Sequence, residues 1–276
     1  MTRQCFFMLL MAMTICLLVS VPTGVHAQPT ANDAAPLPQT AWGDPDLQGV
    51  WDFRTITPME RPDELADKEF LTDEEAAEVE EARRDRDSGR DDEVPADIVG
   101  NYNQFWFDCG TDVITTRRTS LVVEPLDGRV PPLTPEAEQK QAELQEARRG
   151  TGMHQPTPGG WVEDLGANGL QVRCITGFNS GPPMTPGGYN NNVQLFQTPT
   201  EVVLLNEMNH NVRIVPLDQR SRGDLRQWAG DSHGYWDDDT LVVETTNFLR
   251  ETSFMQGRSS ADLHLVERFT RTSSNM

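Results

Sequence analysis

The chain has 276 residues, with 43 Asp and Glu against 23 Lys and Arg, and its formal net charge is −20. This charge disfavours binding to nucleic acid and to anionic membrane surfaces, because each phosphate would meet charge of the same sign. A chain of this length suits one large domain with a complete core.

The N-terminal segment predicts export. Arg3 is the only charged residue ahead of an apolar run from Cys5 to about Val21, and the small-residue motif Val-His-Ala follows at 25–27. We therefore expect a signal peptide over residues 1–27 and a periplasmic or extracellular protein with no membrane span after cleavage. A retained anchor is the alternative, and it is disfavoured because the apolar run falls short of the roughly 20 residues that span a bilayer.

A single domain is predicted to follow the signal peptide. Residues 28–41 are small, polar and proline-bearing, which predicts a flexible N-terminus of the exported chain. A β-rich domain is then expected over residues 42–276, with its first strand in the segment LQGVWDF at 47–53.

Two helices are predicted from their N-terminal capping patterns. Thr72 and Glu75 form a capping box that opens TDEEAAEVEEARRD. Thr134 precedes Pro135 at the first helical position of TPEAEQKQAELQEARR, which Gly150 ends. Both segments are polar nearly all round, so we expect two exposed helical insertions that do not form the core.

The remaining segments favour β-strands, because they are rich in β-branched residues and are separated by turn-forming residues. They are TTRRTSLVVEP at 115–125, NVQLFQT at 192–198, TEVVLLNE at 200–207, VRIVPL at 212–217, DTLVVETTNF at 239–248 and LHLVERFTR at 263–271. This spacing predicts a mainly β fold, an antiparallel barrel or sandwich that is lipocalin-like or avidin-like in the loose sense. In the last segment, Leu265, Glu267 and Phe269 would share one face, because side chains alternate along a strand.

Three consecutive aspartates at 237–239 raise the question of a metal or catalytic site. They lie between Tyr235-Trp236, at the end of one predicted strand, and the apolar start of the next. Aspartate is a good turn former that tolerates the left-handed backbone conformation. A calcium loop needs ligands at alternating positions, a glycine turn and a distal glutamate, and this pattern does not occur there. We therefore interpret the aspartates as the tip of a β-hairpin.

Two segments carry candidates for acid and base chemistry. NEMNHNVR supplies Glu207 and His210, together with Arg213, which we assign to ligand binding, and GDSHG supplies Asp231 and His233. If the two connections met at one end of the fold, a carboxylate and an imidazole would be placed for general acid and base catalysis or for part of a metal site. The alternative is that they are turn residues and exposed charges. No metalloenzyme spacing such as HExxH and no nucleotide or haem motif occurs, so neither a metal nor a cofactor is predicted.

Two stretches rich in aromatic residues, glycine and asparagine suggest the mouth of a ligand site. NYNQFWFDCG groups Tyr102, Phe105 and Trp106, and the loop TGFNSGPPMTPGGYNNN carries Tyr189 and Asn191. Aromatic rings beside amides suit a small apolar or carbohydrate-like ligand. The alternative is that the aromatic side chains belong to the core and that the loop has no such role.

Cys109 and Cys174 are the cysteines outside the predicted signal peptide. Two cysteines in an oxidising compartment suggest one disulfide, and whether these two meet is open at this point. The absence of a CxxC spacing between them disfavours a zinc site of the thiolate type.

Six motifs spread along the chain are distinctive as a set. They are PDLQGVWDF, RRTSLVVEPLDGRVPPLTPEA, GPPMTPGGYNNNVQLFQTP, NEMNHNVRIVPLD, GDSHGYWDDDTLVVETTNF and LHLVERFTR. With these motifs the chain resembles a widespread family of uncharacterised secreted bacterial proteins, and the resemblance extends over nearly all of the chain after the signal peptide. The resemblance implies no known activity. It implies a glycine in place of Asp238 and further strands beyond LHLVERFTR, so that the chain would be truncated at its C-terminus and Cys174 would lack its usual partner.

We therefore expect an exported, mainly β protein that binds a small-molecule ligand at one end of its fold. Whether it is an enzyme is open, and the first alternative is a periplasmic hydrolase or lyase that uses Glu207, His210, Asp231 and His233. The second alternative is an envelope interaction protein without a small-molecule site. The identity of the ligand and the oligomeric state do not follow from the sequence.

Overall fold

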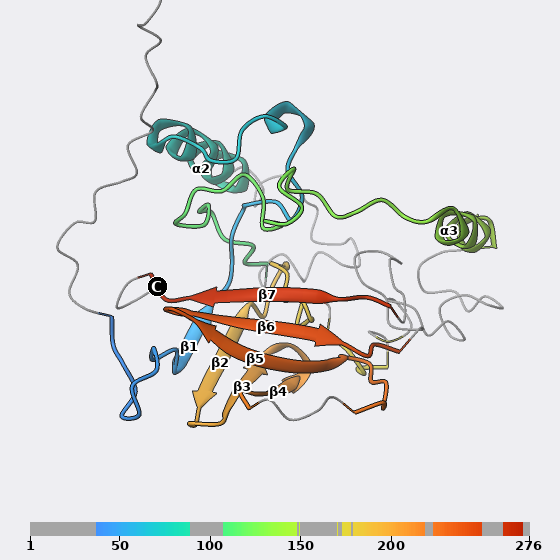
Figure 1. Cartoon of the computed structure of the whole chain (residues 1–276). Helices are drawn as coiled ribbons and strands as arrows, with labels where there is room; N and C mark the ends of the chain where they lie inside the picture. Colours follow the sequence, from blue (N-terminus) through green and yellow to red (C-terminus); the bar gives the residue numbers. More distant parts are fainter. Residues whose placement is uncertain are drawn as a thin grey trace, which may run out of the picture. The chain divides into compact units, whose positions relative to one another are not determined.

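The computed structural model describes residues 37–88, 107–147, 149, 170, 173–177, 179–218, 223–249 and 262–272, all within one compact unit, Leu37–Met276 (Figure 1). The predicted signal peptide at 1–27 lies outside these residues, as do Tyr102, Phe105 and Trp106. Across the described ranges, no helix combines the length and the apolar character needed to span a membrane.

The described part begins with a hydrogen-bonded turn. The amide of Asp46 donates to the carbonyl oxygen of Pro38 at 2.9 Å. Gln39 pairs with Pro45 in an isolated antiparallel bridge. The hydroxyl of Thr40 donates to the carbonyl oxygen of Asp44 at 3.1 Å. Residues 37–41, which belong to the predicted flexible N-terminus, are therefore held in place.

The strands of the described residues form two antiparallel sheets (Figure 1). The four-stranded sheet has the order β1-β2-β3-β4, with bounds Gly49–Asp52, Asn192–Gln197, Glu201–Asn206 and Val212–Pro216. The three-stranded sheet has the order β5-β6-β7, with bounds Asp231–Asp237, Thr240–Thr246 and Leu265–Thr270. The prediction of a mainly β, antiparallel fold is therefore confirmed.

One predicted strand, 115–125, is wrong. Its only ladder contact among the described residues is an isolated bridge between Arg118 and Phe70. Its amides instead donate to scattered carbonyl oxygens, Leu121 to Pro58 at 2.9 Å and Thr119 to Glu69 at 3.0 Å. These irregular contacts satisfy backbone hydrogen-bonding groups of the segment. Its β-branched residues therefore do not produce a strand.

Both predicted helices form, and their caps are as expected. In α2, Asp73–Ser88, the amide of Thr72 donates to Oε2 of Glu75 at 2.8 Å, and the amide of Glu75 donates to Oγ1 of Thr72 at 3.2 Å. This is the reciprocal pattern of a capping box. The hydrogen bond from Lys68, followed by that from the Thr72 amide, holds the pKa of Glu75 below its ordinary value of 4.5.

The second helix, α3, spans Pro135–Ala147 and ends ahead of the predicted stop at Gly150, which lies outside the described residues. Its N-cap is Thr134, whose Oγ1 accepts a hydrogen bond from the amide of Ala137 at 3.2 Å. The described residues also contain two short 3-10 helices, η1 at Asp63–Leu65 and η3 at Met208–His210.

The facing sides of the two sheets share one core. Its buried members are Leu47, Val193, Leu195, Val202, Leu204, Val215, Leu241 and Val243. In Figure 1 the strands β5 to β7 run across β1 to β4. Gly234 of β5 allows close packing at this crossing, since a Cβ at this position would lie 2.8 Å from Cγ1 of Val215. Trp51 of β1 and Trp236 of β5 both pack against the core.

A charged pair is part of the same interior. Both amino groups of the Arg213 guanidinium on β4 contact the carboxylate of Glu267 on β7, with Nη2 to Oε1 at 3.1 Å. Both side chains are only 9% exposed. Leu265, Glu267 and Phe269 are the more buried residues of β7, which confirms the predicted shared face. The pair therefore joins the two sheets from inside.

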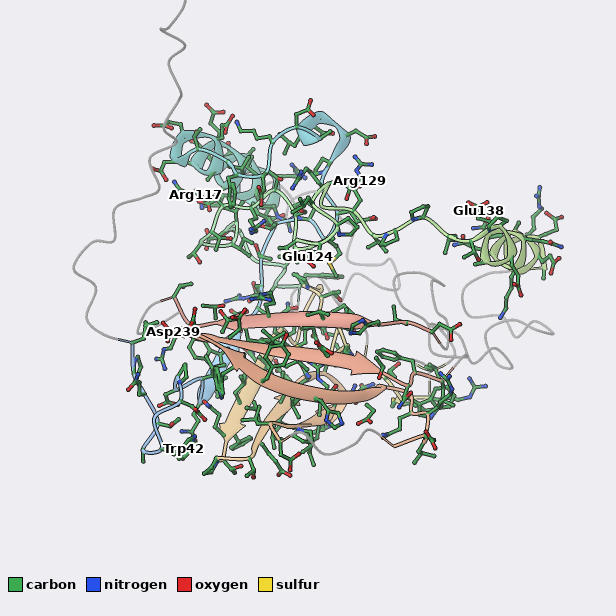
Figure 2. The ribbon with its side chains drawn as sticks, viewed as in Figure 1. Trp42, Arg117, Glu124, Arg129, Glu138 and Asp239 are labelled. Carbon is green, nitrogen blue, oxygen red and sulfur yellow. The ribbon has the colours of Figure 1, made fainter. Side chains whose placement is uncertain are left out.

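The three aspartates form a hairpin tip, as predicted. Asp237 pairs with Thr240, so Asp238 and Asp239 are the two residues of the turn. Asp238 has a φ of 51°, in the left-handed region. Figure 2 shows Asp239 at this end of the hairpin, and the Asp237 carboxylate accepts a hydrogen bond from Nη2 of Arg268 at 2.5 Å.

Candidate functional site

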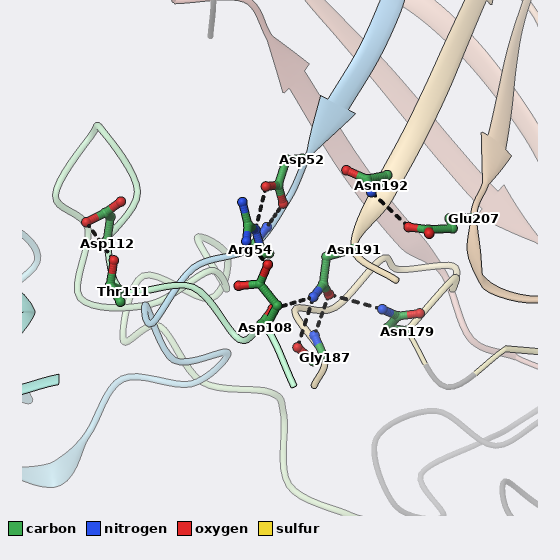
Figure 3. A network of polar contacts seen from close by, with 10 residues as sticks. All are labelled: Asp52, Arg54, Asp108, Thr111, Asp112, Asn179, Gly187, Asn191, Asn192 and Glu207. Carbon is green, nitrogen blue, oxygen red and sulfur yellow. Dashed lines mark hydrogen bonds and ion pairs between the residues drawn. The ribbon is translucent and has the colours of Figure 1, made fainter. Parts of the chain in front are cut away.

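Polar side chains gather at one end of the four-stranded sheet, where β1 ends and β2 begins (Figure 3). They surround a hollow of about 260 Å³, here called the sheet-end pocket. Its lining residues are Asp52, Arg54, Asp108, Tyr189, Asn190, Asn191, Asn192 and Glu207. A smaller hollow of about 190 Å³ shares three of these residues and extends to Gly110, Thr111 and Asp112.

Arg54 lies between two carboxylates of the sheet-end pocket. Its Nε donates to Oδ2 of Asp52 at 2.5 Å, and its Nη1 contacts the carboxylate of Asp108. Burial lowers the pKa of Arg54, but the hydrogen bonds and charges of Asp52 and Asp108 outweigh this effect and raise it above its ordinary value. The guanidinium therefore stays protonated and fixes both carboxylates on the pocket wall.

Asn191 holds the pocket wall together. Its Oδ1 accepts from the amide of Gly187 at 2.8 Å and from Nδ2 of Asn179 at 3.1 Å. Its Nδ2 donates to the carbonyl oxygens of Asp108 at 3.1 Å and Gly187 at 3.0 Å. These bonds use the full hydrogen-bonding capacity of the amide. Asn191, predicted to bind the ligand, is therefore a positioning residue that fixes the backbone at Asp108 and Gly187 and the side chain of Asn179.

The glycines of the motif PGGYNNN explain how an aromatic side chain reaches this site. A Cβ on Gly188 would lie 2.5 Å from Cε1 of Phe107, so only glycine admits this ring. The amide of Asp108 donates to the carbonyl oxygen of Gly188 at 2.6 Å. The Phe107 ring meets the ring of Tyr189 edge-on, with centroids 6.1 Å apart. Tyr189 thus lines the pocket, supported from the side by Phe107, and its role in ligand binding stays a prediction.

Of the predicted catalytic residues, Glu207 lies on the sheet-end pocket. It follows β3, is exposed, and accepts a hydrogen bond from Nδ2 of Asn192 at 2.8 Å. His210 follows in the same connection between β3 and β4, with a left-handed φ of 55° and an exposed side chain. His210 does not belong to the pocket lining.

Asp231 and His233 form a separate pair on β5. Nε2 of His233 lies 3.4 Å from Oδ1 of Asp231. Both point away from the core, because Gly234, the next residue, faces it. Across the strands, Glu244 is the partner of His233, and its Oε2 lies 3.6 Å from Nε2 of His264. Within the described ranges no three His, Cys, Asp or Glu side chains are placed to hold a metal ion, so the two predicted acid and base pairs do not join into such a group.

The structure also places Arg213 and the two cysteines. Arg213 is bound to Glu267 inside the protein, so its predicted role in ligand binding is replaced by one in packing between the sheets. The thiols of Cys109 and Cys174 are both free, the first half-buried and the second exposed. The predicted disulfide is therefore not formed in this structure.

The main residues missed by sequence reasoning are Asp52, Arg54, Asp108 and Asn192. A signal was present, because Asp52 and Arg54 are charged residues two apart at the end of an otherwise apolar strand. It carried little weight since local sequence does not reveal that residue 108 lies beside residue 54.

Comparisons with known proteins return no match: no family model fits the chain, and no curated protein or solved structure is similar to it.

Proposed function

We propose that this chain is an exported protein that binds a small polyhydroxylated, carbohydrate-like ligand in the sheet-end pocket. The observation that carries the proposal is that Tyr189 and the Asp52–Arg54–Asp108 network line one hollow together with Glu207. Of the two ligand classes suggested by the sequence, apolar and carbohydrate-like, this polar lining favours the second.

The pocket lining matches the chemistry of hydroxyl groups. A hydroxyl both donates and accepts hydrogen bonds, so it needs acceptors and donors side by side. Asp52 and Asp108 supply acceptors, and the Arg54 guanidinium and the amide of Asn192 supply donors. Tyr189 adds an aromatic surface on which the C–H side of a sugar ring can rest. Because Arg54 already fixes the two carboxylates, little order has to be imposed on binding.

We further propose that the two sheets form an open sandwich with the ligand at its end and not inside it. Val202, Leu204 and Val215 are fully buried between the sheets. The pair of Arg213 and Glu267 occupies part of the same interior. Such a filled interior leaves the role of ligand site to the end of the sheet, unlike the central cavity of a lipocalin.

A periplasmic hydrolase is the second candidate, supported by the three carboxylates of the pocket. Hydrolysis of a glycosidic bond uses two carboxyl groups, one as acid and one as base or nucleophile. Arg54 pairs with Asp52 and Asp108, whereas Glu207 contacts the neutral amide of Asn192. If the protein is a hydrolase, Glu207→Gln should abolish hydrolysis while saccharide binding continues. If it is only a binding protein, neither the unchanged chain nor the Glu207→Gln variant should hydrolyse a saccharide.

Calorimetric titration with a panel of mono- and disaccharides tests the proposal. Arg54→Ala should weaken binding of any active saccharide at least about tenfold, which corresponds to about 1.4 kcal/mol. Arg129→Ala is the matched control, because Arg129 pairs with Asp63 at an exposed position outside the pocket. The proposal fails if no saccharide binds, or if the two variants weaken binding equally.

A further inference from the structure

The side of the four-stranded sheet that points away from the core is apolar and exposed. Its most exposed side chains are Val50 at 67%, Val212 at 58%, Ile214 at 56% and Phe196 at 43%. The strand register arranges the outward residues in two rows, Val50–Gln194–Leu205–Val212 and Phe196–Val203–Ile214. These seven residues are called the apolar face.

The apolar face is large and uncharged. None of its side chains carries a charge, and Gln194 is its one polar member. Its exposed area is on the order of a few hundred Å², the size at which apolar patches on monomeric proteins are often binding sites. The apolar face is therefore a candidate binding surface for an apolar group.

The sheet-end pocket continues directly from this face. Asp52 pairs with Asn192 across β1 and β2, and Asn192 contacts Glu207 next to β3. Asp52 lies two residues beyond Val50, and Asn192 lies two residues before Gln194, so both point to the same side of the sheet as the apolar face. The distance from Asn192 to Phe196 along β2 is roughly 13 Å, at about 3.3 Å per residue.

Resting on the proposed function, we propose that the ligand is an amphipath with an uncharged polyhydroxylated headgroup and one apolar tail. The headgroup occupies the sheet-end pocket, and the tail lies along the apolar face across its two rows. The carboxylates of Asp52, Asp108 and Glu207 disfavour an anionic headgroup because they outnumber Arg54. The tail removes the exposed rows from water, which supplies affinity that the headgroup alone lacks.

A second copy of the chain fits the apolar face less well. The two ends of the apolar face carry carboxylates. Asp52 and Glu207 lie at the end beside the pocket, and Glu201 lies at the opposite end. Two such faces packed together would bring like charges close, in a chain whose formal net charge is already −20. A single small amphipath avoids this repulsion.

Titration with glucose, maltose, octanol and the two octyl glycosides, octyl glucoside and octyl maltoside, tests the proposal, with the glycosides kept below their micelle concentrations. At least one alkyl glycoside should bind about tenfold tighter than its free sugar and than octanol. Val212→Asn should weaken the alkyl glycoside about fivefold, since part of the buried valine contact is lost, and leave sugar binding unchanged. Val266→Asn is the matched control, an exposed valine on β7 outside the apolar face, and should change neither. A thermal melt of each variant confirms folding.

The outcomes separate the amphipath from the proposed function. The amphipath proposal is overturned, and the proposed function stands, if sugars bind but the alkyl chain does not raise the affinity. The same holds if Val212→Asn and Val266→Asn change the affinity for the alkyl glycoside equally. If octanol binds as tightly as the glycosides, the headgroup contributes nothing and both proposals are overturned. If no alkyl glycoside binds and Val212→Asn abolishes a concentration-dependent dimer in sedimentation, the face is an interface between copies, which also overturns the amphipath.

Discussion

The two faces of the four-stranded sheet divide their side chains in an unexpected way along β4. Arg213 points inward and pairs with Glu267, whereas its neighbours Val212 and Ile214 point outward and are exposed. The charged residue of this strand is thus inside beside the buried Val215, whereas the aliphatic residues Val212 and Ile214 are outside. Alternation along a strand places successive side chains on two opposite faces, but the part of the protein that packs against each face decides which face is buried.

The energies of the two faces differ in kind. Inside, removing Arg213 and Glu267 from water is costly, and the two-point contact between guanidinium and carboxylate offsets that cost. Outside, the apolar rows stay in contact with water until something covers them, and each covered side chain then contributes favourably. The inner face therefore serves stability, and the outer face is available for binding.

The largest expected effect comes from breaking the inner pair. Arg213→Ala should lower the free energy of unfolding by about 3–5 kcal/mol, because it leaves the Glu267 carboxylate buried without its partner. Val212→Ala, one residue away on the outer face, should change it by less than about 0.5 kcal/mol. Urea unfolding at equilibrium measures both, and similar values for the two variants would contradict the assignment of the faces.

A medium effect is expected where the two sheets cross. Gly234→Ala places a methyl group 2.8 Å from Cγ1 of Val215 and 3.1 Å from Cδ2 of Leu217. Such overpacking should cost about 1–3 kcal/mol. The control is Gly223→Ala, whose new methyl group would have the amide nitrogen of Leu225 as its nearest neighbour, at 3.9 Å. Equal melting temperatures for the two variants would show that the sheets are not this close at Gly234.

The smallest effect concerns the turn that sets the register of β5 on β6, and with it the face on which each side chain lies. Asp238→Gly should raise the free energy of unfolding by up to about 1 kcal/mol, because glycine adopts the left-handed conformation without strain. Asp239→Gly should bring no gain, since a positive φ is found at Asp238 and not at Asp239. Thermal unfolding of the two variants compares the positions, and a larger gain at Asp239 would contradict this assignment of the turn.

Much of the fold was predictable, because its signals are local. The helix cap at Thr72, the hairpin at Asp238 and the alternation in β7 each depend on residues close together in the chain. The segment 115–125 was not predictable in this way, since its backbone partners, such as Glu69 for Thr119 and Pro58 for Leu121, lie far earlier in the chain. Its composition favours a strand only where another strand is available to pair with it.

The candidate site was predictable only in part, for the same reason. Tyr189, Asn191 and Glu207 were identified from residue type and loop composition. The role of Asn191 and the partnership of Arg54 with Asp108 were not, because both depend on contacts between distant segments. Arg213 was misplaced since a charge within an aliphatic strand usually marks the solvent side, and its burial depends on Glu267 in another sheet.

The amide of Asn191 also has a consequence for the order of folding. It bonds to the carbonyl oxygen of Asp108, 83 residues earlier in the chain, whereas β2, β3 and β4 pair with their immediate neighbours along the sequence. A contact that closes a long loop first costs the entropy of bringing distant parts of the chain together, and its favourable energy is gained only afterwards. Such contacts therefore tend to form late. A folding chain should therefore assemble these strands first, and it should pass through a period in which it is already largely folded while the wall of the sheet-end pocket is not yet formed.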